Sequence, residues 1–221
     1  MIVADTAQGR VTVDPPKTKV GIRLSGGADS AIIAYMLGLY KKQVRDIKII
    51  PITVVNEIKP WQDIYAKAVV RFIENELQIK FEDHVIPKEV IPASEYASFQ
   101  HSFQRLLYKT GVVECHYTGI TLNPPIHEFN IGEEFHQYRD ALRDYDGELK
   151  STSTPSGKAV TPLANINKRG VAELYRNYDL IDTLFPITRS CENRRVFHTE
   201  PHCGTGCWWC LERQWGFGRL K

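Results

Sequence analysis

LSGGADSA, residues 24–31, separates two apolar segments of the chain. Residues 17–24 predict a buried strand before it, and residues 29–42 predict a helix after it, with Asp29 or Ser30 at the N-cap. The two adjacent glycines can adopt positive φ and bring backbone amides close to an anion. The N-terminus of the helix adds a partial positive charge. The stretch therefore predicts a phosphate-binding loop where a strand passes into a helix.

The loop lacks the lysine of a Walker sequence, because Gly27 and Ala28 stand where that sequence has Lys and Ser/Thr. The G-x-G-x-x-G pattern of dinucleotide-binding loops is also absent. In the remaining pattern, S-G-G-x-D-S, Ser25 and Ser30 offer hydroxyl donors at either rim. Asp29 would repel a phosphate unless a cation lay between them, so it indicates Mg²⁺. Amides, hydroxyls and a metal suit pyrophosphate; the alternative is a glycine-rich turn that only caps a helix.

Strands and helices alternate along the first half of the chain. Predicted strands cover residues 17–24, 47–55, 81–87 and 112–120, and predicted helices cover residues 29–42, 61–77 and 94–111. This order favours a parallel sheet covered on both faces. The predicted fold class is α/β: a single Rossmann-like domain with a parallel five-stranded sheet, helices on both faces and a C-terminal zinc-binding element.

Two later segments complete this picture. Residues 144–159 are polar and rich in turn formers, which predicts a mobile loop over the sheet, and residues 167–185 predict a further helix. The helix over residues 61–77 is expected to bury a face of five apolar residues. These are Ile64, Ala68, Val69, Phe72 and Ile73.

Four of the five cysteines lie close together near the C-terminus. They are Cys191, Cys203, Cys207 and Cys210, spaced C-x₁₁-C-x₃-C-x₂-C. Four thiolates can close a tetrahedral structural Zn²⁺ site, and His198 or His202 could replace one of them. A redox pair at Cys207 and Cys210, or buried free thiols, are the alternatives. Cys115 is expected to be buried in its strand.

Composition limits the class of protein. The chain has 221 residues, 43% of them hydrophobic and 24% charged, as in ordinary soluble globular proteins. Its net charge of +2 makes no strong electrostatic case for a nucleic-acid or membrane partner. The N-terminus has no signal pattern, and no apolar run reaches membrane-spanning length. Together with clustered cysteines, these features predict a cytoplasmic protein.

The sequence SGGADS resembles the pyrophosphate loop of the PP-loop ATP pyrophosphatases, which have the adenine-nucleotide alpha hydrolase-like fold. Three later stretches are similar to the closing third of the 7-cyano-7-deazaguanine synthases, the QueC family. They are TPLANINKRGVAELY (residues 161–175), FPITRSCE (185–192) and CGTGCWWCLERQWGF (203–217). The resemblance implies a PP-loop domain over residues 1–186 and a zinc-binding segment over residues 187–221, packed on the same domain.

This resemblance implies an ATP-dependent carbon–nitrogen ligase. Such an enzyme cleaves ATP between the α and β phosphates and adenylates 7-carboxy-7-deazaguanine or a close relative. Ammonia then gives the amide, and a second ATP dehydrates the amide to the nitrile, preQ₀. The implied small molecules are therefore ATP as co-substrate, Mg²⁺, ammonia and a 7-deazapurine acid or amide, with Zn²⁺ in a structural role. Neither a membrane nor a nucleic acid is expected as a partner, and a homodimer is left open.

The resemblance also implies site residues. Lys168 matches the lysine of the family's P-L-x₄-K segment and would neutralise charge on the α-phosphate. Asp29, Ser25 and Ser30 join it as expected catalytic residues. The expected ATP-binding residues are Leu24, Ser25, Gly26, Gly27, Ala28, Asp29, Ser30 and Gly119, and the expected metal ligands are the four clustered cysteines.

The middle of the chain departs from that family. Gly206 lengthens one cysteine gap, and residues 98–103 and 118–129 match neither of the family's stretches near the deazaguanine. Other groups could hold a flat heterocycle. They are Phe99, Phe103, Asn123, Glu128 and Trp208. Two alternatives remain: a PP-loop ligase or sulfurtransferase acting on another acceptor such as a tRNA base, and a non-catalytic nucleotide-binding relative.

Overall fold

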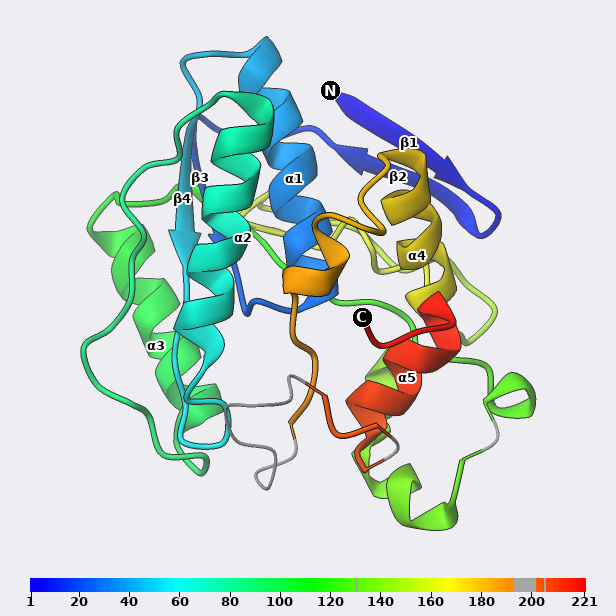
Figure 1. The fold of residues 1–221 in the computed structure, drawn as a ribbon. Helices are drawn as coiled ribbons and strands as arrows, with labels where there is room; N and C mark the ends of the chain where they lie inside the picture. The colour runs from blue at the N-terminus through cyan, green and yellow to red at the C-terminus, as the bar shows by residue number, and fades with distance from the viewer. Residues whose placement is uncertain (130, 193–201, 205) are drawn as a thin grey trace.

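A parallel sheet of four strands, in the order β4-β3-β5-β6, forms the centre of the molecule (Figure 1). The computed structural model describes residues 1–129, 131–192, 202–204 and 206–221. The four strands are β3 (Lys19–Arg23), β4 (Lys48–Ile52), β5 (Cys115–Tyr117) and β6 (Ala159–Val160). All neighbouring strands run parallel. The predicted α/β class is therefore confirmed.

The predicted count of five strands is wrong for the described residues. The segment predicted as a strand over residues 81–87 lies beside β4 and makes one parallel bridge, Ile52 to Val85. Val85 N donates to Pro51 O at 2.9 Å, and Thr53 N donates to Val85 O at 3.0 Å. Pro51 has no N–H to continue this ladder, so the pairing ends after a few bonds.

A hairpin that the sequence interpretation missed opens the chain. Strands β1 (Ile2–Thr6) and β2 (Gly9–Val13) pair antiparallel, with Ile2 opposite Val13. Alternate residues of both strands are buried in the main core, and the hairpin packs against α1 (Ala28–Gln43) and α4 (Lys168–Asn177). It therefore covers part of the helical layer without joining the central sheet.

Helices cover both faces of the sheet, as predicted. Ile49 of β4 faces the main core with α1 and α2 (Gln62–Leu77). The next residue, Ile50, faces the opposite side, where Leu107 of α3 (Tyr96–Lys109) packs. The last helix is α5 (Trp208–Phe217), which packs against α4 (Figure 1). Short 3₁₀ helices cover Ile126–Glu128, Glu133–Tyr138, Ala141–Arg143 and Phe185–Ile187.

Two helices end or begin away from their predicted residues. Helix α1 begins at Ala28 with Gly27 as N-cap, so Asp29 and Ser30 lie in its first turn and do not cap it. Helix α4 ends at Asn177 instead of continuing to residue 185, because Asp179 adopts a left-handed backbone with φ of 56°.

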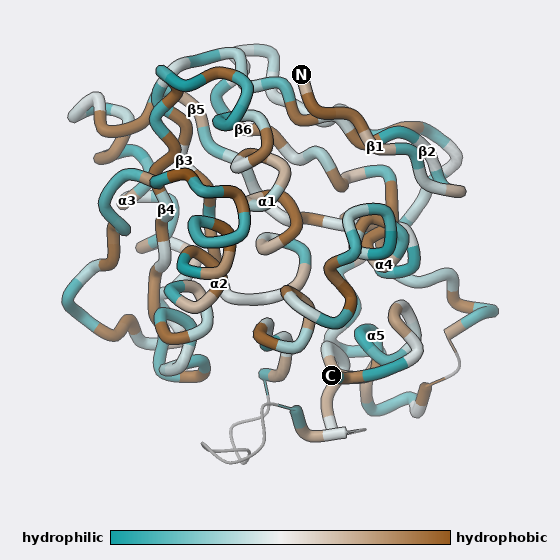
Figure 2. Tube along the Cα trace, turned by 45° about the horizontal axis from the view of Figure 1, so that its top comes forward, coloured by the Kyte–Doolittle hydropathy of each residue, from teal (hydrophilic) through white to brown (hydrophobic). Residues whose placement is uncertain are grey.

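The buried face of α2 differs from the predicted one. Hydrophobic and hydrophilic residues alternate along this helix (Figure 2). Val69 and Ile73 are buried as predicted, but Ile64 is 58% exposed. The stripe that packs inward also includes Gln62, Ala66 and Leu77. The helix is therefore rotated toward residues that the apolar pattern alone did not select.

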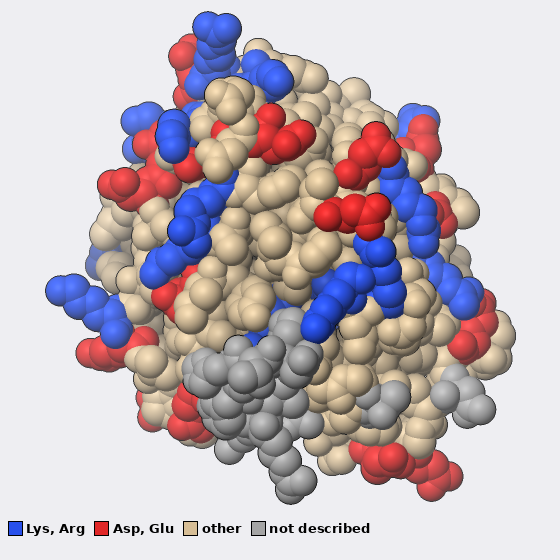
Figure 3. Space-filling view, viewed as in Figure 1, with Lys and Arg blue, Asp and Glu red and all other residues tan. Residues whose placement is uncertain are grey.

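Three further observations concern membrane-spanning helices, surface charge and the polar segment 144–159. Among the described residues, none of the helices has both the length and the apolar composition needed to cross a bilayer. On the face shown in Figure 3, acidic and basic side chains are interspersed. In the polar segment 144–159, Lys150 N donates to Asn165 Oδ1 at 2.7 Å. The mobility of this segment stays a prediction.

Candidate active site and metal centre

The glycines of the loop 24–31 are required by close packing. Gly26 has φ of 77°, and a Cβ atom there would lie 2.6 Å from Cβ of Tyr65 on α2. The carbonyl of Gly26 accepts a hydrogen bond from Arg189 N at 2.8 Å, which ties the loop to the segment before the cysteines. At Gly27 a Cβ would lie 3.3 Å from Ser25 Oγ. The loop backbone is therefore held in a fixed, tightly packed shape.

The two predicted serines lie together at the centre of the loop. Ser30 Oγ accepts from Ser25 N at 3.2 Å, lies 3.1 Å from Ser25 Oγ and donates to Gly27 O at 3.2 Å. Leu24 continues the strand ladder, since its N donates to Ile52 O at 2.8 Å. Its side chain is buried, as is that of Ala28. These two residues position the loop with their side chains in the core.

Gly119 follows β5 and touches the start of α1. A Cβ atom at this position would lie 2.7 Å from Ser30 N and 2.8 Å from the carbonyl carbon of Asp29. Both contacts are with backbone, which cannot rotate away. The glycine therefore lets the end of β5 meet the loop directly, and its predicted place in ATP binding stays a prediction.

Replacing Gly119 by alanine is expected to push the end of β5 away from the loop and to destabilise the fold by about 1–3 kcal/mol. Chemical denaturation measures this loss. Gly147→Ala is the control, because Gly147 has open space around it and a φ of 96°. Its substitution costs only backbone strain, about 1 kcal/mol. Gly119→Ala is expected to weaken nucleotide binding, and Gly147→Ala is not. Equal nucleotide binding in the two variants would contradict the close contact between the end of β5 and the loop.

A buried chain of charges lies beside the loop. Lys168, the first residue of α4, places Nζ 2.7 Å from Asp29 Oδ1 and 2.5 Å from Oδ2. The same Nζ lies 3.7 Å from Glu212 Oε2 of α5, and Arg143 Nη2 donates to Glu212 Oε1 at 2.7 Å. The side chains of Lys168 and Glu212 are only 5% and 3% exposed. The predicted pair Asp29 and Lys168 thus meets, together with two residues that the sequence interpretation missed.

The loop divides a cleft into two compartments. One cavity has a volume of about 360 Å³ and the other of about 290 Å³. Both are lined by Ser25, Gly27, Asp29, Lys59 and Gly119. An anion bound at the loop would therefore be reachable from both sides.

The first compartment lies over the carboxyl ends of β3, β4 and β5. Ile52 and Val54 give it an apolar wall, and Arg23, Tyr96 and Gln100 line its polar side. Arg23 donates to Gln100 Oε1. Burial lowers the pKa of Arg23 and raises the pKa of Tyr96. Ligands of open parallel sheets bind at this edge, so this compartment suits a nucleoside.

The second compartment lies between the loop and the cysteines, and aromatic and charged groups line it. The Arg189 guanidinium carbon lies 3.6 Å from the centroid of the Trp61 ring. Lys59 forms an ion pair with Glu192, and its Nζ lies 5.9 Å from the centroid of the Trp209 ring. Burial raises the pKa of Glu192. The described lining holds as many acidic as basic residues, so the compartment suits a planar ligand with both hydrogen-bond donors and acceptors.

None of the five residues predicted to hold a heterocycle lines either compartment, among the described lining residues. Phe99 and Phe103 stack on each other along α3, with ring centroids 5.8 Å apart. Trp208 is buried against Phe129. Asn123 lines a separate cavity, and Glu128 pairs with Arg169. These five residues lie outside the two compartments at the loop, so their contact with a heterocycle stays a prediction.

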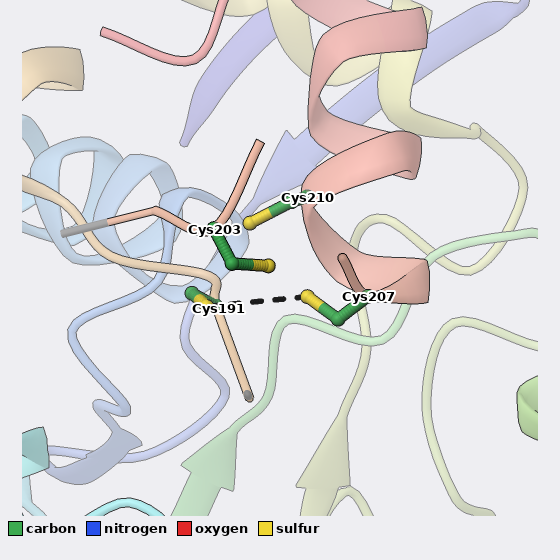
Figure 4. Close-up of side chains that lie close together, drawn as sticks. All are labelled: Cys191, Cys203, Cys207 and Cys210. Atoms are coloured by element: carbon green, nitrogen blue, oxygen red, sulfur yellow. Dashed lines mark hydrogen bonds between the residues drawn. The ribbon is translucent and has the colours of Figure 1, made fainter. Parts of the chain in front are cut away.

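The four clustered cysteines converge on one point, from the segment before α5 and from its first turn (Figure 4). Their sulfur atoms all lie within 4.8 Å of one another, and Cys207 Sγ is 4.0 Å from Cys191 Sγ. Cys191, Cys207 and Cys210 are buried. All five cysteines are free, so no disulfide pairs Cys207 with Cys210. The cluster could bind a metal ion.

Without a cation the surroundings disfavour thiolates at the cluster, and a bound cation would reverse this. Their mutual contacts and burial raise the pKa of Cys207 to about 12 and raise that of Cys210, which a bound cation would offset. Cys207 is the N-cap of α5, where the helix dipole stabilises negative charge. His202 Nδ1 lies 3.8 Å from Cys210 Sγ, so this ring contacts a cysteine without replacing one. His198 lies outside the described residues.

Cys115 behaves as predicted. It is fully buried in β5, and burial raises the pKa of its thiol to about 11. It lies outside the cluster and serves as core packing.

No protein-family model and no curated protein matches the chain. Among solved structures, it is similar to the U34-tRNA thiolase NcsA from Methanococcus maripaludis with its [4Fe-4S] cluster. The two share 21% sequence identity, with a TM-score of 0.49. The match covers 77% of this chain and 60% of the thiolase chain, so this chain spans less than two thirds of that protein.

Proposed function

We propose that the protein is an ATP-dependent adenylating enzyme of the PP-loop type, which cleaves ATP between the α and β phosphates. One observation carries this proposal: the glycine-rich loop, with Asp29 and Lys168 paired beside it, faces two compartments at once. Adenylation needs this arrangement, because the acceptor and the leaving pyrophosphate must lie on opposite sides of the α-phosphorus. A passive nucleotide-binding module has no need for the second compartment.

The reaction would proceed by in-line displacement. A carboxylate oxygen of the acceptor bonds to the α-phosphorus, the bond from that phosphorus to the bridging oxygen breaks, and pyrophosphate departs with the electron pair. The amides of the loop and the hydroxyls of Ser25 and Ser30 hold pyrophosphate. Lys168 stabilises the charge that develops on the phosphoryl oxygens. Ammonia then attacks the acyl carbon and releases AMP, leaving an amide.

The residues at the loop fit Mg²⁺. When Mg²⁺ binds together with a nucleotide, its ligands are one or two protein carboxylates, phosphate oxygens and water molecules, and the loop supplies one such carboxylate. Asp29 supplies that carboxylate, and its side chain is 24% exposed in the cleft. When bound, Mg²⁺ would screen the charge of the phosphates. Lys168 Nζ contacts both oxygens of Asp29, so the lysine charge would lie beside the phosphates that Mg²⁺ accompanies.

The four cysteines fit Zn²⁺. A zinc–sulfur distance of about 2.3 Å in a tetrahedron separates the sulfur atoms by roughly 3.8 Å. The observed upper limit of 4.8 Å is close to this value. A four-iron cluster binds each thiolate through a different iron and spreads the sulfur atoms farther apart. With four protein ligands the zinc would have no open position, so its role would be structural.

We further propose a 7-deazapurine carboxylate, 7-carboxy-7-deazaguanine or its amide, as the acceptor, with amide or nitrile as product. The second compartment supports this choice, because the Trp209 ring lines it and charged groups of both signs, such as Arg189 and Glu192, offer partners for the donors and acceptors of a deazaguanine ring. A tRNA base is the competing acceptor.

AMP release in the presence of each acceptor tests this choice. Zinc-loaded protein with ATP, Mg²⁺ and ammonia is expected to release AMP faster when millimolar 7-carboxy-7-deazaguanine or its amide is added. A site that hydrogen-bonds its substrate rejects analogues lacking those groups, so guanine is the matched negative control. Stimulation by tRNA alone, with neither deazapurine binding, would make the proposed acceptor wrong while leaving adenylation intact.

A further inference from the structure

Helix α5 lies directly against Lys168. A Cβ atom at Gly216 would lie 2.6 Å from Cβ of Lys168 and 2.8 Å from its backbone carbonyl carbon. Glu212 stands four residues earlier, on the same face of the helix, and reaches the amine. One face of α5 therefore admits the stem of Lys168 and holds its charged end.

Glu212 carries no role in the metal site or the loop. It is 2% exposed, and its two carboxylate oxygens face different cations: Arg143 at 2.7 Å and Lys168 at 3.7 Å. Arg143 also donates to Thr121 O at 2.8 Å, beside the end of β5. A buried carboxylate is stable only when cations or hydrogen-bond donors pair with it. The carboxylate of Glu212 in turn holds the side chains of Arg143 and Lys168 in place. Glu212 thus joins α5, α4 and the end of β5 around the cleft.

The position of α5 depends on its N-terminus. Cys207 caps the helix, and Cys210 lies in its first turn, two residues before Glu212. The buried Arg213 also anchors the helix, donating to Thr188 Oγ1 at 2.8 Å and Phe185 O at 2.9 Å. The cysteine site, Arg213 and the stacking of Phe217 on Phe185, with ring centroids 4.1 Å apart, therefore attach α5 to the segment that leads from α4.

We propose that α5 is a positioning element through which the cysteine site controls Lys168: Gly216 packs on the lysine stem, Glu212 adds a second carboxylate 3.7 Å from the amine that Asp29 binds, and loss of the metal loosens this arrangement. Glu212 is a positioning residue that acts through Lys168. The consequence for catalysis rests on the proposed function, but the position of Lys168 does not. The metal would then be structural for the fold and also necessary for a correctly placed lysine.

Chemical labelling of lysines tests this directly. Zinc-loaded protein is treated briefly with an amine-acylating reagent, and the labelling rate of each lysine is measured by peptide mass spectrometry. The buried Lys168 is expected to react slowly, whereas Lys67 and Lys80, with side chains 51% and 83% exposed, react fast. In Glu212→Gln the zinc content should stay full, and labelling of Lys168 should rise severalfold, because one of the two carboxylates beside its amine becomes neutral.

The matched control is Gln214→Ala, since Gln214 lies on the exposed side of the same helix. It should leave both Lys168 labelling and AMP release unchanged. In Glu212→Gln, kcat for AMP release should fall about tenfold with little change in KM for ATP, because ground-state ATP contacts are kept. Unchanged labelling of Lys168 in Glu212→Gln would overturn the proposal, whatever reaction the protein catalyses.

Removal of the metal is the second test of the proposal. Chelator-treated protein should show faster labelling of Lys168 while Lys41 stays at its original rate, because Lys41 Nζ bonds to Ile47 O within the main domain. If Lys41 also becomes reactive, the whole domain has unfolded. The labelling of Lys168 in zinc-loaded Glu212→Gln then decides whether the proposal holds. If Lys168 is still protected after complete metal loss, the remaining contacts of α5 with α4, Phe185 and Thr188 hold the helix in place, and this result would overturn the control by the metal.

Discussion

Cys203→Ser is expected to lower the zinc content from one per chain to nearly none and to lower the melting temperature by roughly 10 °C. The reason is that metal binding and folding of the C-terminal segment are coupled. In a domain of this size each kcal/mol of lost stability corresponds to about 2–4 °C. Metal analysis by mass spectrometry and thermal unfolding measure the two effects. Cys203 is the least buried of the four, so its loss removes a ligand with little effect on packing.

Cys115→Ser is the matched control, because Cys115 is a fully buried cysteine outside the cluster. This variant should be somewhat less stable, because the serine hydroxyl is polar and lies in the apolar core. Its zinc content should stay at one per chain. Protein purified without chelator that contains no zinc, or that contains a disulfide within the cluster, would contradict the zinc site.

Asp29→Asn is expected to reduce AMP release by about two to three orders of magnitude, as losses of comparable charged groups do in other active sites. The amide has the same shape as the carboxylate but cannot supply the negative charge that Mg²⁺ requires. The fold should persist, because Asp29 lies at the cleft surface and the amide oxygen still accepts from Lys168 Nζ. Steady-state AMP release and thermal unfolding are the measurements.

Asp63→Asn serves as the control for this prediction. Asp63 also lies in the first turn of a helix and also pairs with a lysine, Lys67, but on the exposed face of α2. Its replacement should change neither AMP release nor stability by much, since exposed ion pairs contribute about 0–1 kcal/mol. Full activity in Asp29→Asn would mean that another group carries the metal or that the loop does not act on ATP.

The loop could be predicted from the sequence because its parts are contiguous. Strand, two glycines and helix follow within a few residues, so local preferences decide the shape. The cysteine cluster was predictable for a similar reason: Cys207 and Cys210 are three residues apart in one helical turn, and Cys203 is four residues before Cys207. Only the first helical residue, Ala28, differed from the expected start.

The charged partners of the loop could not be predicted in the same way. Arg143 and Glu212 lie 69 residues apart and meet only because α5 packs against α4 and the end of β5. Neither residue belongs to a pattern with a known spacing. Lys168 was found only through its family resemblance. Partnerships of this kind depend on tertiary packing, which residue type and periodicity do not determine.

The error at the sheet and the place of two aromatic residues outside the loop compartments have physical causes. Residues 81–87 have the composition of a strand, but the missing N–H of Pro51 breaks the ladder that would make them one. The aromatic residues Phe99 and Phe103 were chosen by chemistry, yet they stack on each other along α3. The hairpin of β1 and β2 was missed because each strand has only five residues and a weak alternation.

The central claim is that the loop 24–31 directs cleavage of ATP between the α and β phosphates. The most direct measurement follows the phosphorus species by ³¹P NMR in zinc-loaded protein with Mg²⁺, ATP, ammonia and 7-carboxy-7-deazaguanine. The predicted result is AMP and pyrophosphate appearing in equal amounts, with both slowed by about two to three orders of magnitude in Asp29→Asn. Appearance of ADP and inorganic phosphate would place the cut at the β–γ bond and contradict the account.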